Sequence, residues 1–160
     1  MRPGYQTLRD DPTARIAFSE LVRGFVTNRL TIVVYVPVRD EEGRLIGVVN
    51  ASLNVEHIQQ WFLGMSLSPG SNLFVRNSQD HKLMLRQPWG NDDNFNKPVR
   101  NRLQERIDAG ETSGRDRFVA VLDGTPRIYA FRKLRRYPFY VVVGMSENDA
   151  LARWRGEVVF

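Results

Sequence analysis

The chain has 160 residues and a formal net charge of +5, with 42% hydrophobic and 26% charged residues, which is typical of one folded domain with its own core. It contains no cysteine, which excludes disulfides, thiolate metal sites and cysteine nucleophiles. Basic residues are spread along the chain with acids between them, and no stretch is long and apolar enough to cross a bilayer, so we expect neither nucleic-acid binding nor a membrane span within these residues.

The N-terminal third predicts a helix followed by a strand pair. Apolar side chains recur on one side of residues 11–25, which favours an amphipathic helix. Residues 31–38 are rich in β-branched side chains, and an acidic turn at 40–43 leads to a second apolar run at 45–53. We therefore expect residues 31–53 to form an antiparallel hairpin.

A second helix is expected directly after Asn54, whose side chain can cap its first turn. Apolar residues then recur at helical spacing until Gly64, which can end the helix. These residues are Val55, Ile58, Trp61 and Phe62. We expect Trp61 to lie in the core and this helix to cover one face of a sheet.

The middle of the chain predicts a second hairpin and a third helix. Residues 71–76 and 82–86 form the hairpin around a polar turn, and a polar loop follows at 89–96. Pro98 suits the first turn of a helix, and Gly110 can end it. The apolar positions of this helix are Val99, Leu103 and Ile107.

Three more strands and a last helix are predicted in the C-terminal third. Residues 117–122, 127–134 and 139–145 are the strands, and the Asp-Gly dipeptide at 123–124 is a strong hairpin signal. A Ser-x-x-Asp pattern at 146–149 resembles a capping box that opens the last helix. The apolar residues that we expect to pack this helix against the sheet are Ala150, Leu151 and Trp154.

The order of these elements predicts the fold class. Strands joined by tight turns pair antiparallel, so we expect an α+β, PAS-like domain with a central antiparallel sheet of about five strands flanked by helices. The hairpin at 31–53 and the last three strands would make up this sheet, and residues 1–160 would form a single PAS-like domain. A hollow for a bound molecule is expected between the sheet and residues 54–98.

Four stretches of the chain resemble the PAS-like Cache domains, which are extracytoplasmic sensors of bacterial membrane signalling proteins. They are GRLIGVVNASL at 43–53, DHKLMLRQP at 80–88, DGTPRIYAFRKL at 123–134 and PFYVVVGMS at 138–146. Where the family usually has Asp-Gly before the second stretch, this chain has Asp80-His81. The resemblance is strongest to sensors attached to GGDEF or GGDEF-EAL output domains, the diguanylate cyclase type.

The resemblance implies signal sensing and no catalytic activity in this chain. On that basis we expect a fragment of a longer inner-membrane protein that lies on the periplasmic side, binds a small organic molecule and is a homodimer in the full-length receptor. The terminal helices would relay the signal to a cytoplasmic diguanylate cyclase or kinase domain, through a membrane span after Phe160. Two alternatives stay open: an intracellular PAS domain with a bound cofactor, and a ligand-free dimerisation module.

Enzyme and metal motifs are scarce in the sequence. There is no G-x-S-x-G nucleophile motif and no glycine-rich phosphate loop. His57 and His81 are the only histidines, and they lack the spacing of a metal-binding pair. We therefore expect no catalytic residue, no metal and no cofactor.

Arg86 is the first candidate for ligand contact. A guanidinium at the end of an apolar strand can hold a carboxylate through two hydrogen bonds. Strand alternation places Arg86 on one face with Lys82 and Met84. The alternative is a structural arginine tied to loop carbonyls or to an acid such as Asp123.

The other candidates come from two predicted strands. Tyr129 and Phe131 share a face with Arg127 and can either line the hollow or pack in the core. Asn50 and Ser52 share a face of an otherwise apolar strand, where polar side chains need partners, and a bound small molecule is one such partner. The candidate ligand-binding residues are therefore Arg86, Tyr129, Phe131, Asn50, Ser52 and Asp123.

Overall fold

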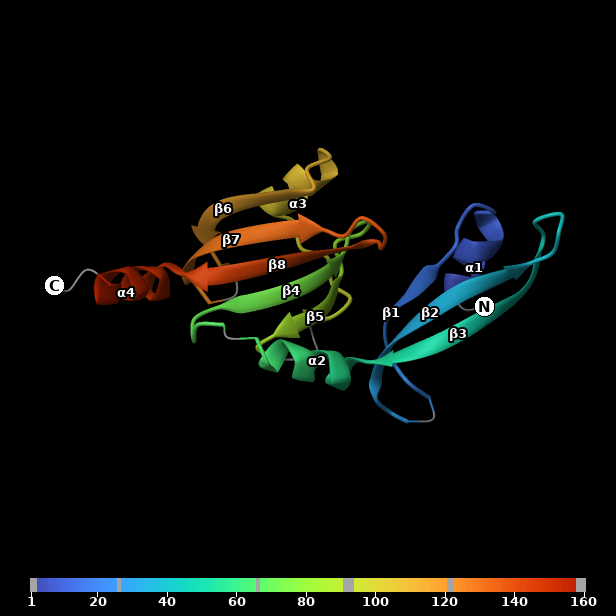
Figure 1. Cartoon of the computed structure of the whole chain (residues 1–160), viewed down its shortest axis with the longest axis horizontal. Coiled ribbons are helices and arrows are strands. Elements are labelled where there is room, and N and C mark those ends of the chain that lie inside the picture. Colours follow the sequence, from blue (N-terminus) through green and yellow to red (C-terminus); the bar gives the residue numbers. More distant parts are fainter. Residues whose placement is uncertain (1–2, 26, 66, 91–93, 121–122, 158–160) are drawn as a thin grey trace. The chain divides into compact units, whose positions relative to one another are not determined.

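The computed structural model describes residues 3–25, 27–65, 67–90, 94–120 and 123–157. The chain folds into two compact units, residues 1–60 and 61–160, and each has its own antiparallel sheet (Figure 1). The predicted α+β class, with antiparallel strands and flanking helices, is confirmed. In the described ranges, none of the helices has the length and apolar character that a membrane span requires.

The first unit is a helix packed on a three-stranded sheet. Its elements are α1, Pro3–Asp10, then β1, Ala17–Arg23, β2, Leu30–Arg39, and β3, Leu45–Asn54. The strands lie side by side in that order. Leu8 of α1 is fully buried and packs with Ala17 and Tyr35 of the sheet. The predicted turn between β2 and β3 is confirmed, with Gly43 at a φ of 80°, where glycine is not strained.

The predicted helix at 11–25 is wrong, because α1 ends before these residues and β1, Ala17–Arg23, forms within them. Burial alternates along β1, with Ala17, Ser19 and Leu21 inside, which is the period of a strand. The register of β1 against β2 shifts near Ser19, and the hydroxyl of Ser19 accepts a 2.8 Å hydrogen bond from the N–H of Val33. The apolar residues fit both periods, and pairing with β2 decided between them.

Helix α2, Val55–Leu63, begins as predicted, since the N–H of Glu56 donates to Asn54 Oδ1 over 2.9 Å. Trp61, however, is 73% exposed, so its predicted place in the core is wrong. The buried residue of this helix is Val55. Helical spacing shows that a helix is amphipathic, but it does not show which element covers the apolar side.

The second unit contains the five-stranded sheet. Its strands are β4, Asn72–Asn77, β5, Leu83–Gln87, β6, Ser113–Val119, β7, Pro126–Lys133, and β8, Phe139–Ser146. They pair antiparallel in the order β5-β4-β8-β7-β6 (Figure 1). The predicted number of strands is confirmed, but the predicted composition is wrong. The hairpin of β4 and β5 joins the last three strands, whereas the hairpin at 31–53 belongs to the first unit, because β8 pairs along β4.

Helix α3, Arg102–Asp108, begins later than the predicted start at Pro98, which instead pairs with Lys82 in an isolated β-bridge. Asn101 caps the helix: its Oδ1 accepts from the N–H of Leu103, and its own N–H donates to the side chain of Gln104. The two bonds form a complete capping box, which sets the start of the helix. The core beneath α3 consists of Leu103, Ile107, Ala120, Tyr129, Phe131, Tyr140 and Val142.

Helix α4, Glu147–Glu157, follows β8 directly. The N–H of Asp149 donates to Ser146 Oγ over 3.2 Å, which confirms the predicted cap. Leu151 is 45% exposed, so its predicted packing against the sheet is wrong. The side chain of Trp154 and residues 158–160 lie outside the described part of the chain. Polar contacts rather than Leu151 therefore hold the first turn of α4.

Candidate functional site

A cavity of about 390 Å³ lies on one face of the five-stranded sheet. This volume is near the lower end of the range for small-molecule sites, roughly 300–1,000 Å³. Alternate residues of the strands line it on one side, and residues of the segment 94–104, which leads into α3, complete the lining. The strands contribute Asn72, Phe74, Arg76, Phe118 and Tyr129 to the lining, and Ala120 joins them directly after β6.

The strand register explains why these side chains meet. Asn72 of β4 lies opposite Gly144 of β8, and Gly144 in turn lies opposite Tyr129 of β7. Phe74 lies opposite Arg86 of β5. Opposed residues of antiparallel strands share a face, so side chains from three strands gather on the side of the sheet that α3 covers.

Arg86 extends beside the ring of Phe74, with its guanidinium carbon 6.0 Å from the ring centroid. Its Nε donates to the carbonyl of Pro88 over 3.1 Å. Gly90 leaves room for this arrangement, since a Cβ there would lie 2.5 Å from Arg86 Nη1. One N–H group of Arg86 thus binds a loop carbonyl, as one of the two sequence-based alternatives expects, while the guanidinium still lines the cavity.

A β-bulge changes the predicted face of β5. Leu83 and Leu85 pair with consecutive residues of β4, so Met84 is the extra residue between them. Leu83 therefore lines the cavity with Arg86. Strand alternation, which predicted that Met84 shares the face of Arg86, fails here because alternation alone cannot locate a bulge.

Arg76 is buried, with 7% of its surface exposed. Its Nη1 donates to the carbonyl of His81 over 2.9 Å, and its guanidinium carbon lies 5.7 Å from the centroid of Phe74. Burial lowers the pKa of Arg76, and the nearby charge of Arg86 lowers it further. An arginine nonetheless stays charged at neutral pH. Among the residues that the structure describes, no carboxylate pairs with Arg76 or Arg86.

Asp123 and Arg127 form a two-point ion pair in the cavity lining, with Nη1–Oδ1 and Nη2–Oδ2 distances of 2.7 and 2.6 Å. This pair holds the pKa of the Asp123 carboxyl well below its usual range and raises the pKa of Arg127. Arg127 Nε also donates to the carbonyl of Gly70 over 3.0 Å. Asp123 thus binds Arg127 and not Arg86, and the charges of Asp123 and Arg127 neutralise each other.

A buried hydrogen-bond network lies behind the cavity lining at Gln104. Gln104 Nε2 donates to the hydroxyl of Tyr140 over 2.9 Å, and His81 Nδ1 lies 3.2 Å from the same oxygen. His81 Nε2 lies 3.0 Å from Asp108 Oδ1. Tyr140 is completely buried, and burial raises the pKa of its hydroxyl. His81 has a φ of 58°, in the left-handed region that favours glycine, and the network holds it there with its carbonyl toward Arg76.

Asn72 lines the cavity and is 9% exposed, and within the described residues its Oδ1 has no hydrogen-bond partner. The oxygen lies close over Gly144, where a Cβ would collide with it. Buried polar atoms are ordinarily paired. A donor from a bound molecule or from water is therefore expected at this side chain.

Three predicted site residues come together in the cavity: Arg86, Tyr129 and Asp123. Phe131 is buried in the core beneath α3 and is not part of the lining. Asn50 lines a separate cavity of about 340 Å³ in the first unit. Ser52 is exposed on β3. The structure thus divides the predicted set between the two units.

Sequence analysis missed Arg76, Asn72 and Gln104. The first two carried a signal, because they alternate with Phe74 along an apolar strand, and polar residues at such positions need partners. The hollow was predicted between the sheet and residues 54–98, but the cavity is lined in part by residues of the segment 94–104. In the described ranges, no three His, Asp or Glu side chains are grouped so that they could hold a metal ion.

No family model and no curated protein sequence matches the chain significantly. The structure resembles the extracellular domain of rpHK1S-Z16, a protein assigned as a histidine kinase, with a TM-score of 0.74 and 21% identity over 93% of this chain and 61% of that one. It also resembles the periplasmic sensory domain of the Campylobacter jejuni chemoreceptor Tlp1, with a TM-score of 0.71 and 16% identity over 93% and 56% of the two chains. A third similar structure is the ligand-binding domain of the Pseudomonas aeruginosa amino acid chemoreceptor PctB with L-arginine, with a TM-score of 0.67 and 17% identity over 97% and 58%.

These matches define the class of the fold. All three are extracellular, periplasmic or ligand-binding domains of a histidine kinase or a chemoreceptor. The chain spans between 56% and 61% of their lengths. The protein therefore has the fold of extracytoplasmic sensor domains, as the resemblance of its sequence motifs to Cache domains led us to expect.

Proposed function

We propose that this chain is part of an extracytoplasmic sensor and that the cavity of the 61–160 unit binds a small organic molecule. The cavity carries the proposal, because it combines apolar walls with a few placed polar groups, as small-molecule sites do. The fold supports it, since similar structures were solved with L-isoleucine in Pseudomonas fluorescens CtaA and with L-arginine in PctB.

Within this cavity we propose direct ligand contact for Arg86 and Tyr129. Asp123 would act indirectly, by neutralising Arg127 and fixing its place in the lining. Phe131 would support the floor from the core. Asn50 and Ser52 remain predicted contacts of the first unit, where Asn50 lines the smaller cavity.

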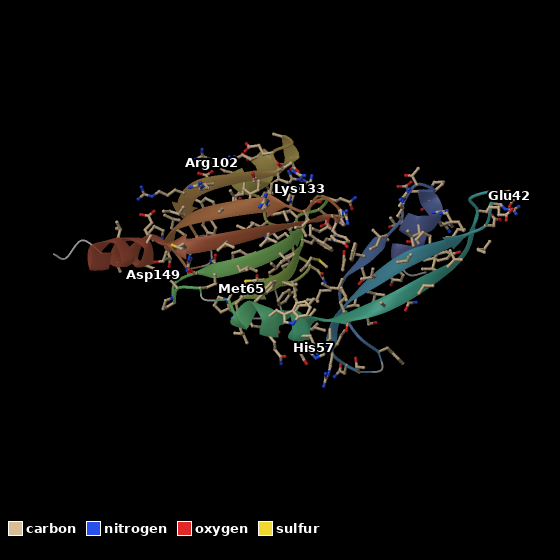
Figure 2. The ribbon with its side chains drawn as sticks, in the orientation of Figure 1. Glu42, His57, Met65, Arg102, Lys133 and Asp149 are labelled. Atoms are coloured by element: carbon tan, nitrogen blue, oxygen red, sulfur yellow. The ribbon has the colours of Figure 1, made fainter. Side chains whose placement is uncertain are left out.

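A short chain of hydrogen bonds offers a route from the cavity to α4. Arg127 donates to the carbonyl of Gly70, and the N–H of Gly70 donates to Asp149 Oδ2 over 2.8 Å. Figure 2 shows Asp149 where α4 leaves the five-stranded sheet. A ligand that displaces Arg127 would change the position of the first turn of α4, so we propose α4 as the output element.

The remaining parts of the proposal rest on the sequence resemblance. The parent would be a homodimeric inner-membrane protein, with a span after α4 and a diguanylate cyclase or kinase output domain, and sequencing the parent gene beyond Phe160 tests this. Residues 1–160 would work as one sensor domain although they fold as two compact units. Calorimetry tests that point: one cooperative unfolding transition supports it, and two separate transitions contradict it.

A thermal-shift screen against small metabolites tests ligand binding, because a ligand that binds only the folded state raises the melting temperature. Ala120 lines the cavity and Ala130 is exposed on the other face of β7. A true ligand should therefore stabilise the wild type and Ala130→Phe but not Ala120→Phe, whose new ring fills the cavity. If no compound acts on the wild type, the ligand-free dimerisation module is favoured, and a haem or flavin absorbance band would favour the cofactor-binding alternative.

A further inference from the structure

Three arginines of the second unit each hold an acid through two N–H groups. The pairs are Arg106 with Glu111, Arg117 with Glu147, and Arg127 with Asp123. Arg76 and Arg86 differ from them, since within the described ranges each donates to a main-chain carbonyl and not to an acid. Both line the cavity, and neither has a carboxylate partner in the part of the chain that the structure describes.

The guanidinium groups of Arg76 and Arg86 both lie near the ring of Phe74, and their charges interact. Arg86 lies opposite Phe74 across β5 and β4, and Arg76 follows Phe74 on the same face of β4. Both guanidinium carbons lie near the Phe74 ring, at 5.7 and 6.0 Å from its centroid. Their like charges repel, and the burial of Arg76 adds a desolvation cost. An oxyanion bound between the two guanidiniums would offset both the repulsion and the desolvation cost.

The rest of the lining indicates an apolar body. Phe118 stacks on Tyr129 with ring centroids 4.2 Å apart and an interplanar angle of 11°, which makes a flat apolar wall. Lys97 and Arg100 also line the cavity and are exposed, so they add positive charge to its lining. Such a field attracts anions from solution.

From this arrangement we infer that the ligand is a small organic carboxylate with an apolar body, whose carboxylate is held between Arg76 and Arg86. This inference rests on the proposed ligand-binding function of the same cavity. The planar fork of a guanidinium matches the two oxygens of a carboxylate. A neutral molecule would leave both charges unpaired and would lose the main polar contacts that the cavity offers.

The test compares anions with neutral molecules of the same shape. The melting temperature of the full chain is measured with sodium benzoate, sodium hexanoate and sodium phosphate at constant ionic strength, and with benzamide and hexanamide. We expect at least one of the two organic carboxylates to raise it, its amide to have no effect, and phosphate to act more weakly.

Three variants locate the effect. Arg76→Gln and Arg86→Gln should each weaken carboxylate binding roughly tenfold or more, because each removes a charge-assisted hydrogen bond to the ligand. Arg132→Gln removes the same charge from an exposed position on the other face of β7 and should bind as the wild type does. Circular dichroism checks folding, and if the buried Arg76→Gln fails to fold, the half-buried Arg86→Gln decides.

The outcomes separate this inference from the proposed function. Equal effects of a carboxylate and its amide, or undiminished binding by Arg86→Gln, overturn the inference. If phosphate raises the melting temperature as much as both carboxylates do, the inference that the ligand has an apolar body is wrong. If neither carboxylate acts while another compound of the metabolite screen stabilises the chain through the cavity, the inference fails and the sensor function stands. If no compound acts at all, both fail.

Discussion

The backbone N–H of Gly70 donates a 2.8 Å hydrogen bond to Asp149 Oδ2, and this bond ties the loop ahead of β4 to the first turn of α4. The carbonyl of Gly70 accepts a hydrogen bond from Arg127 Nε in the cavity lining. Asp149 is also held through its own N–H, which donates to Ser146 Oγ. One glycine thus connects a cavity side chain with the C-terminal helix through both of its main-chain polar groups.

Gly70→Ala should destabilise the fold by about 1–3 kcal/mol, a range typical of overpacking. A Cβ at Gly70 would lie 2.6 Å from Asp149 Oδ2 and 2.7 Å from Ser146 Cβ. We expect faster amide hydrogen exchange in the first turn of α4, because the loop must move away from it. Gly47→Ala is the control, since its Cβ would meet only Val38 Cβ, at 3.9 Å. Unchanged exchange in α4 would show that Gly70 does not restrain this helix.

Asp123 should make stability depend on pH in the acid range. Its pKa is lowered in the folded state by the ion pair with Arg127, so it stabilises the fold at pH values above the unfolded pKa of about 4. That contribution is lost as the pH falls from there toward the lowered folded pKa. In melting curves from pH 7 to pH 3, the wild type should therefore lose its advantage over Asp123→Asn below about pH 4. A constant difference across the range would contradict the ion pair.

Tyr140→Phe should cost about 1–3 kcal/mol, because it leaves the buried amide of Gln104 without its acceptor. The hydroxyl of Tyr140 accepts from Gln104 Nε2 over 2.9 Å and lies 3.2 Å from His81 Nδ1. Tyr35→Phe is the control: Tyr35 is also buried, but no described residue hydrogen-bonds its hydroxyl. Urea unfolding measures both, and equal effects of the two variants would mean that the network adds no stability.

Asn101→Ala should lower the free energy of unfolding by about 0.5–2 kcal/mol, as the loss of a helix cap does. Asn101 Oδ1 accepts from the N–H of Leu103 over 2.9 Å, and Asn101 also lines the cavity. Loosening the start of α3 should weaken ligand binding as well. Asn101→Ser keeps a capping oxygen and should retain most of the stability. Chemical denaturation of the three proteins checks this order, and equal losses for Ala and Ser would exclude a capping role.

Features that depend on nearby residues were predictable from the sequence. The turn at 40–43, the cap at Asn54 and the cap at Ser146 all occur where they were predicted, because each is made by groups a few residues apart. The Asp-Gly pair at 123–124 also joins two strands, with Gly124 at a φ of 65°. The antiparallel α+β class followed, since short connections between strands allow little else.

Features that depend on pairing between distant segments were not predictable. The run at 11–25 fits a helix or a strand, and only β2, lying beside it, made it a strand. The sequence alone did not show that β8 would pair with β4, nor that a bulge at Met84 would bring Leu83 to the face of Arg86.

The candidate site shows the same division. The sequence by itself determined that Arg86 and Tyr129 lie on strands with apolar neighbours, where a charge or hydroxyl needs a partner. Only the tertiary structure decided that Arg76 joins Arg86 over one phenylalanine ring and that Asp123 neutralises Arg127 instead. The reason is physical: local dihedral preferences determine turns and caps, whereas the neighbours of a strand residue depend on the register of strands far apart in the chain.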